Sequence, residues 1–160
     1  MTPNALDHVS TVGEAQVAFG NRLGIDLSGK SVGVARAMIE DVIERDFSGE
    51  TNLGSPTAKQ ISLAAKFGFD ISPMTRRVGN AVIDDIMFQL NKDAICSEGL
   101  RPGVEVINKH DIFRRRMVIS SIADDGTVYF RGGNGMKAWA RSLIHAESLA
   151  SSEVTGYAGV

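Results

Sequence analysis

Apolar residues recur with a helical spacing in the first part of the chain and alternate as in strands in the last part. Residues 34–43 and 78–90 place apolar side chains every three or four positions, which predicts an amphipathic helix in each. Shorter helices are predicted before them, at 14–23 and 57–67, and each ends at a glycine suited to a left-handed helix end. From residue 103 onward, alternating runs between glycine-rich turns predict strands. We therefore expect an α+β fold.

The helical part contains an internal repeat. Residues 16–43 align with residues 60–87 at an offset of 44 without a gap. The identical pairs are Gln16/Gln60, Gly24/Gly68, Asp26/Asp70, Ser28/Ser72, Val34/Val78, Ala37/Ala81, Ile39/Ile83 and Asp41/Asp85. Repeated sequence predicts repeated structure, so we expect two helical hairpins, at about 13–47 and 56–91, packed as a four-helix unit with approximate two-fold pseudosymmetry. The second helix of each hairpin is expected to begin at a serine cap, Ser28 or Ser72.

One stretch of the first hairpin matches a nucleotide-binding motif. The sequence GIDLSGKS at 24–31 fits the phosphate-loop pattern G-x-x-x-x-G-K-[ST]. Such a loop needs a buried strand before it and a second, acidic strand for magnesium. Here a helix is predicted before Gly24, and the second copy of the repeat carries Pro73 and Met74 where the Gly-Lys pair stands. We interpret the match as coincidental.

No other stretch predicts an enzyme or a metal site. The three histidines, His8, His110 and His145, are scattered, and the single cysteine, Cys96, has no cysteine partner. The paired aspartates at 84–85 and 124–125 belong to a predicted helix face and a predicted turn. We therefore predict a protein that is not an enzyme, with no catalytic residues, no cofactor and no metal.

The last part of the chain is predicted to form four short strands. These are GVEVINK, FRRRMVISSI, GTVYFRG and MKAWARSL, and the turns ADDG and GGNG between them are suited to tight hairpins. Their order over residues 100–145 resembles an SH3-like small barrel of the Tudor and KOW kind. The resemblance implies a last short strand after a helical turn. It does not imply one function, because small barrels bind nucleic acids, peptides and other subunits.

Strand alternation gathers aromatic and cationic side chains on one face of the predicted barrel. A face of this composition is suited to stacking bases while pairing phosphates. Its members are Tyr129, Arg131, Lys137, Trp139 and Arg141, and the preceding strand would extend the charge with Arg114, Arg115 and Arg116. Two other interpretations remain open: Trp139 packs in the core, and the arginine run serves as a charge that protects an edge strand from aggregation.

Charge is distributed unevenly along the chain. Residues 1–91 hold eight Lys and Arg against eleven Asp and Glu, whereas residues 92–145 hold nine against six. We therefore predict an accessory protein whose barrel binds DNA or RNA and whose acidic helical repeat docks another protein. The alternative is a purely protein-binding adaptor or inhibitor, encoded by a phage or mobile element, without affinity for nucleic acid.

The remaining segments are assigned by composition. We predict an N-terminal extension at 1–12, a linker at 92–99 and a flexible tail at 146–160. The first residues lack the basic start and apolar stretch of a signal peptide, and no run reaches the roughly 18 apolar residues of a membrane span. We expect a soluble, cytoplasmic protein with no membrane contact.

Overall fold

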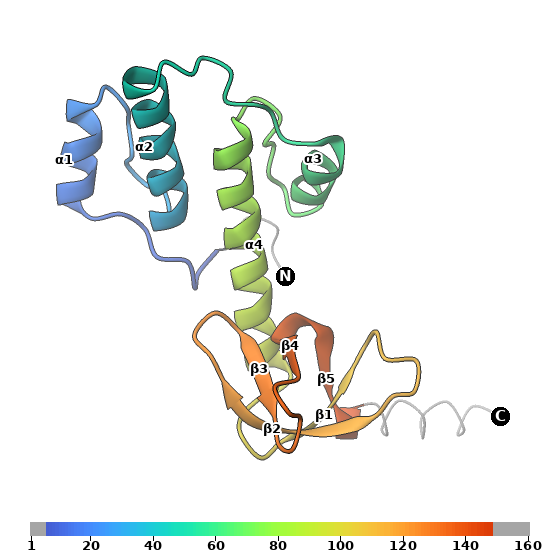
Figure 1. The fold of residues 1–160 in the computed structure, drawn as a ribbon. Coiled ribbons are helices and arrows are strands. Elements are labelled where there is room, and N and C mark those ends of the chain that lie inside the picture. Colours follow the sequence, from blue (N-terminus) through green and yellow to red (C-terminus); the bar gives the residue numbers. More distant parts are fainter. Residues whose placement is uncertain (1–5, 149–160) are drawn as a thin grey trace. The chain divides into compact units, whose positions relative to one another are not determined.

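Residues 6–148, which the computed structural model describes, fold as helices α1 to α4 followed by strands β1 to β5 (Figure 1). The α+β class expected from the sequence is confirmed. The chain divides into two compact units between Gln89 and Leu90. Among the described residues, no helix is long and apolar enough to cross a membrane. Residues 1–5 of the predicted extension and 149–160 of the predicted tail lie outside the described part of the chain.

The helices lie close to their predicted positions. Their bounds are α1 Glu14–Arg22, α2 Val32–Phe47, α3 Ala58–Ala65 and α4 Arg76–Ser97. The two predicted helix-ending glycines, Gly24 and Gly68, have φ angles of 78° and 84°. Because side chains with a Cβ rarely adopt this left-handed region, glycine is the residue that fits there.

Helix α4 is longer than the sequence indicates, and the predicted linker at 92–99 is wrong for most of its length. The helix continues to Ser97 and ends before Gly99, whose φ is 60°. Two residues of this extension, Ala94 and Ile95, pack against the core of the second unit. Burial of these two residues stabilises the last turns of the helix. The sequence pattern did not indicate these turns, because the neighbouring residues are polar.

The core of the first unit depends on the short links between its helices. Leu27, from the link after α1, and Ile71, from the link after α3, are both fully buried. A Cβ added at Gly20 would lie 2.6 Å from the Leu27 side chain, so α1 and its link are in close contact. One apolar residue of each link therefore points into the core.

The same local hydrogen bonds occur in both links, 44 residues apart. The backbone N–H of Ser28 donates to Asp26 at 2.9 Å, and that of Ser72 donates to Asp70 at 3.0 Å. Each serine hydroxyl also bonds to the same aspartate, so the prediction of Ser28 and Ser72 as helix caps is wrong. An aspartate two residues earlier captures the serine in a turn, and each helix begins farther along the chain.

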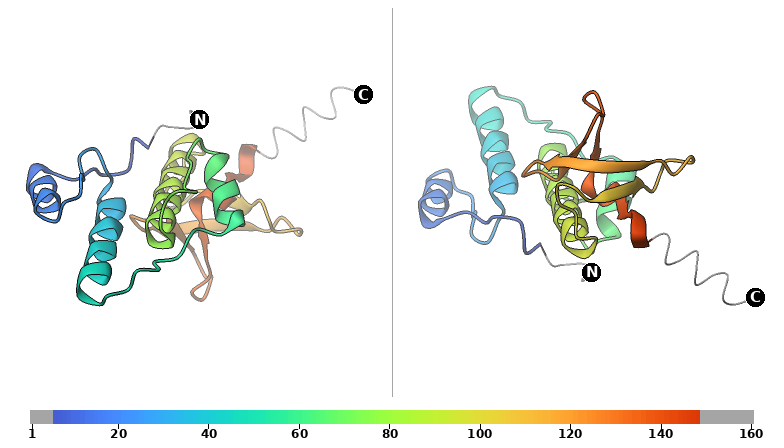
Figure 2. Two further views of the ribbon diagram at one scale, coloured as in Figure 1. Left: turned by 90° about the horizontal axis from the view of Figure 1, so that it is seen from above. Right: turned by 90° about the horizontal axis from the view of Figure 1, so that it is seen from below.

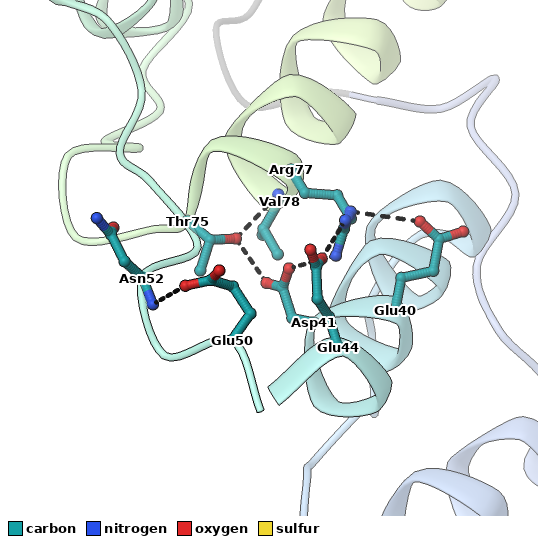
Figure 3. A network of polar contacts seen from close by, with 8 residues as sticks. All are labelled: Glu40, Asp41, Glu44, Glu50, Asn52, Thr75, Arg77 and Val78. Atoms are coloured by element: carbon teal, nitrogen blue, oxygen red, sulfur yellow. Dashed lines mark hydrogen bonds and ion pairs between the residues drawn. The ribbon is translucent and has the colours of Figure 1, made fainter. Parts of the chain in front are cut away.

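The actual caps come three residues later and join the two halves of the first unit. The Ser31 and Thr75 hydroxyls accept from backbone N–H groups of the first turns of α2 and α4, at 3.0 and 3.2 Å. The Ser31 hydroxyl also donates to Asp85 in α4, and the Thr75 hydroxyl donates to Asp41 in α2 (Figure 3). Each cap is therefore bonded to a carboxylate of the other half.

Asp41 is the centre of a larger charged network. It is only 5% exposed, and the Arg77 guanidinium donates to it at 3.0 Å (Figure 3). Arg77 also pairs with Glu40 and Glu44, and the bond to Glu44 is the main cause that raises the pKa of Arg77. The network explains how a buried aspartate is tolerated on α2, since a buried charge needs a charged or hydrogen-bonding partner.

The second unit is built on one antiparallel sheet with the order β4-β3-β2-β1-β5, whose strands are labelled in Figure 1. Strands β4 and β5 are its edges, so the sheet is open. A 3₁₀ helix, η1, lies between them in sequence. The bounds are β1 Glu105–Asn108, β2 Arg116–Ile122, β3 Thr127–Phe130, β4 Lys137–Trp139, η1 Ala140–Ser142 and β5 Leu143–His145.

One face of the sheet forms the core of this unit. Val106, Ile119, Val128 and Leu143 are fully buried there, and Phe130 is 7% exposed. A bulge in β2 between Ile119 and Ser121 shifts the register and lets Ile122 pack on the same side.

Three predicted strands are shorter than expected, and four candidate residues lie outside them as a result. Arg114 has a φ of 50°, which is incompatible with a strand, so β2 begins only at Arg116. The strand predicted through Arg141 ends at Trp139, and Arg141 lies in η1. Arg115 precedes β2, and Arg131 follows β3, which ends at Phe130. The prediction that Arg114, Arg115, Arg131 and Arg141 belong to strands is therefore wrong.

Candidate nucleic-acid interface

The face of β2, β3 and β4 opposite the core carries most of the predicted site residues. Tyr129 lies directly opposite Lys137, and Thr127 lies opposite Trp139. Directly paired residues of antiparallel strands share a face, and the intervening pair, Val128 and Ala138, packs on the core side. We call this face the outer face. It contains Arg116, Tyr129, Lys137 and Trp139, together with Arg131, which directly follows β3 and donates its backbone N–H to the Val118 oxygen.

The two aromatic residues of the outer face are accessible. Trp139 is 44% exposed and Tyr129 is 36% exposed, so the interpretation of Trp139 as a core residue is wrong. The Arg141 Cζ atom lies 4.9 Å from the centre of the Trp139 ring. Although Arg141 comes from η1, it therefore still joins the aromatic group, through a cation–π contact.

Arg141 is held in place from the side of α4. Its backbone N–H and its Nη1 atom both donate to the Asn91 side chain at 3.2 Å. Asn91 also donates to the backbone oxygen of Asp125 at 3.1 Å, so it ties η1 to the turn between β2 and β3. Partial burial lowers the pKa of Arg141, but an arginine remains protonated in proteins. The result is a fixed positive charge beside Trp139.

Ion pairs divide the predicted cations into two groups. Arg116 pairs with Glu105 at 2.9 Å, which neutralises its charge. Within residues 6–148, no carboxylate lies within ion-pair distance of Arg131, Lys137 or Arg141. Lys137 still lies near enough to Asp125 for its charge to contribute to lowering the pKa of that carboxyl. The three cations next to Trp139 and Tyr129 form no ion pair within residues 6–148, so they can pair with an external anion.

Arg114 lies away from the outer face, in the loop between β1 and β2. This β1–β2 loop, residues 109–115, also carries Ile112 and Phe113, which are 86% and 75% exposed. Sequence reasoning missed both residues as candidate contacts. The signal for them was an apolar pair inside the charged string KHDIFRRR.

The phosphate-loop match at 24–31 lies between two helices. It follows α1, and its last residue, Ser31, caps α2 and donates to Asp85. Burial raises the pKa of Asp85, and the nearby charge of Asp84 adds to that shift. The Ser31 hydroxyl and the Asp85 carboxylate are thus bonded to each other, and both have a structural role.

The helical unit, predicted to dock a protein, has its own exposed features. On α2, Ile43 is 45% exposed and Phe47 is 81% exposed. A cavity of about 270 Å³ lies between α2 and the link before α4, and is mostly apolar. Its lining includes Val34, Met38, Val42, Met74 and Val78, with Lys30 and Arg45 as its basic residues.

The chemistry of a metal site is not apparent in the described part of the chain. Residues 6–148 contain no group of three or more His, Cys, Asp or Glu side chains arranged to hold a metal ion.

Compared with known proteins, the chain matches no family model, no curated protein and no solved structure.

Proposed function

We propose that the chain is a non-enzymatic accessory protein that binds nucleic acid through the outer face of its sheet. One observation carries this proposal: two exposed aromatic rings, Tyr129 and Trp139, share a surface with three cations that form no ion pair among the described residues. Aromatic faces stack on bases, and lysine and arginine pair with phosphates. Neither requires a particular base sequence, so binding is expected to tolerate many sequences.

The number of available cations sets the expected salt dependence. For a single strand, the logarithm of the binding constant falls with the logarithm of salt by about 0.7 per neutralised phosphate. If Arg131, Lys137 and Arg141 each contact one phosphate, the slope is about −2. A fourfold rise in salt would then weaken binding by about 15- to 20-fold.

The single tryptophan provides the first test. Trp139 emission is followed while the protein is titrated with single-stranded DNA, duplex DNA and RNA at low and at physiological salt. Saturable quenching with the expected slope supports the proposal. No quenching, together with no binding in an assay that uses labelled nucleic acid, overturns it.

Two arginines of the outer face form a matched pair for mutagenesis. Arg131 has no carboxylate partner among residues 6–148, whereas Arg116 is paired with Glu105. We expect Arg131→Ala to reduce the salt slope by about 0.7 and Arg116→Ala to change it less. Equal effects of both substitutions would contradict the role given to the unpaired cations.

We further propose finer descriptions of the two units. The first is a tandem repeat of helical hairpins, which the hydrogen bonds recurring at an offset of 44 support. The second is an SH3-like fold, supported by the strand order β4-β3-β2-β1-β5 and by the 3₁₀ helix before β5. In this description the acidic helical repeat serves as a docking scaffold for a protein partner.

A purely protein-binding adaptor is the second candidate function. Phe47, 81% exposed at the end of α2, favours it, because a large apolar side chain in water suits a protein contact. The test is capture of a partner from a nuclease-treated lysate by the wild type and by Phe47→Ser. A partner retained without nucleic acid, lost in the variant, together with no oligonucleotide binding, would favour the adaptor.

A further inference from the structure

The β1–β2 loop presents two large apolar side chains to solvent. Ile112 is 86% exposed and Phe113 is 75% exposed, more than any other large apolar residue described in the second unit. Both views in Figure 2 show this loop, between β1 and β2, projecting beyond the strands. Exposing such side chains gives up the stabilisation that their burial would provide.

One aspartate fixes the shape of this loop. The Asp111 carboxylate accepts from the backbone N–H of Phe113 at 3.0 Å and from the backbone N–H of Arg115 at 3.1 Å. The Arg115 Nε atom donates to the same carboxylate at 3.0 Å, and its guanidinium lies 6.0 Å from the centre of the Phe113 ring. At the base of the loop, Lys109 donates to the backbone oxygen of Arg141. The exposed side chains are therefore held outward by specific bonds.

The charges of the β1–β2 loop indicate the chemistry of the partner that it would bind. The loop holds Lys109, Arg114 and Arg115, and Arg115 is ion-paired with the loop's only carboxylate, Asp111, so the loop as a whole keeps a net positive charge. A complementary partner combines negative charge with a flat apolar surface. Unpaired nucleotides offer both, because each carries a phosphate and an open base face.

We propose that the β1–β2 loop is a second nucleic-acid contact in which Phe113 stacks on an unpaired base, so that the ligand is single-stranded. This inference rests on the proposed function of the outer face. In a duplex the face of each base is covered by the neighbouring bases. Unstacking two bases costs free energy, which the small number of cations on this surface would not offset. Single-stranded ligands have no such cost.

The geometry of β2 sets the length of this ligand. Arg116, at the start of β2, adjoins the loop, and Tyr129 pairs with Ser121 near the other end of the strand. At about 3.3 Å per residue, the five steps from Arg116 to Ser121 separate the loop from the aromatic pair by about 17 Å along β2. One strand must therefore span several nucleotides to reach both contacts.

The test compares one sequence in two forms. A labelled oligonucleotide of about ten nucleotides, within the range bound by small single-strand modules, is measured by fluorescence anisotropy alone and annealed to its complement. Phe113→Ala should weaken binding of the single strand by about 5- to 150-fold and change duplex binding far less. Phe113→Trp should restore single-strand binding, since it keeps an aromatic face.

The matched control is Phe47→Ala, because Phe47, 81% exposed, is comparable to Phe113 in exposure but belongs to α2 in the first unit. It should leave both affinities unchanged. Thermal melting of each variant checks that the fold is intact. An intact fold is expected for the Phe113 variants because this side chain is largely exposed.

The outcomes separate this inference from the proposed function. If the wild type binds no oligonucleotide, the outer-face proposal fails and the loop proposal fails with it. If the wild type binds but Phe113→Ala is neutral, or weakens duplex and single strand equally, only the loop proposal is overturned. Phe113-dependent binding to anionic lipid vesicles, with no effect on the oligonucleotide, would also overturn it.

Discussion

The loss of a single hydroxyl, in Thr75→Ala, tests how the two halves of the helical unit are held together. The Thr75 hydroxyl accepts from Val78 N–H at 3.2 Å and donates to Asp41 at 2.6 Å. Loss of a helix cap costs about 1 kcal/mol, and loss of a hydrogen bond to a charged group costs about 1.5–3 kcal/mol. We expect Thr75→Ala to lower the free energy of unfolding by about 2.5–4 kcal/mol.

Urea denaturation measures this change, with two signals for the two units. Far-UV circular dichroism reports mainly the helices, whereas emission of the single tryptophan, Trp139, reports the sheet. At a slope of about 1–3 kcal/mol per molar urea, the helical midpoint should fall by roughly 1–4 M. The control is Ser72→Ala, whose hydroxyl bonds to the exposed Asp70 two residues earlier and whose loss should leave the midpoint almost unchanged.

A double-mutant cycle provides the result that would refute this reasoning. Thr75→Ala and Asp41→Asn remove the two partners of one bond, so their effects should be non-additive by about 0.5–3 kcal/mol. Simple addition of the two effects would show that the bond does not stabilise the unit. A cost of Thr75→Ala no larger than that of Ser72→Ala would show the same.

Two further substitutions test other features of the fold. In the sheet unit, a Cβ at Gly126 would lie 2.4 Å from that of Asn91, whereas one at Gly132 meets nothing within 4 Å, and both glycines have positive φ. Gly126→Ala should therefore lower the Trp139-monitored melting temperature well below that of Gly132→Ala, and equal melting temperatures would contradict the close contact. In the helical unit, burial raises the pKa of Asp85, so the stability tied to its protonated form is lost as pH rises through that pKa. The stability of Asp85→Asn relative to wild type should thus increase from about pH 4 to about pH 7, and a pH-independent difference in urea denaturation would refute this sign.

Local signals in the sequence predict the elements that local forces determine. The period of two along β3 and β4 places Tyr129, Lys137 and Trp139 on one face, because strand alternation does not depend on the rest of the fold. Likewise, Gly24 and Gly68 mark helix ends through their own backbone conformation.

Features set by contacts distant in sequence could not be predicted in this way. The extension of α4 to Ser97 depends on packing of Ala94 and Ile95 against the sheet. The outward position of Ile112 and Phe113 depends on the bonds that Asp111 makes within its loop. Composition alone does not distinguish an apolar residue that is buried from one that is held in solvent.

The identical pair Asp41 and Asp85 marks positions whose partners the alignment does not reveal. The sequence indicates an outer helix face for Asp85, yet Asp41 is 5% exposed and both carboxylates accept from a cap in the other half of the unit. The aspartate is thus identical in both copies of the repeat at a position where each copy accepts a hydrogen bond from the other.

This crossing has a consequence for the two halves as separate molecules. Residues 13–47 contain a cap hydroxyl, Ser31, and a carboxylate, Asp41, but in the chain each is bonded to a residue of the other half. Two copies of such a segment could form both bonds by facing each other about a two-fold axis, with the same pair exchanged in each direction. The helical unit thus has the bonding pattern of a homodimer contained in one polypeptide, and separating its halves would leave two hydroxyls and two carboxylates without their partners.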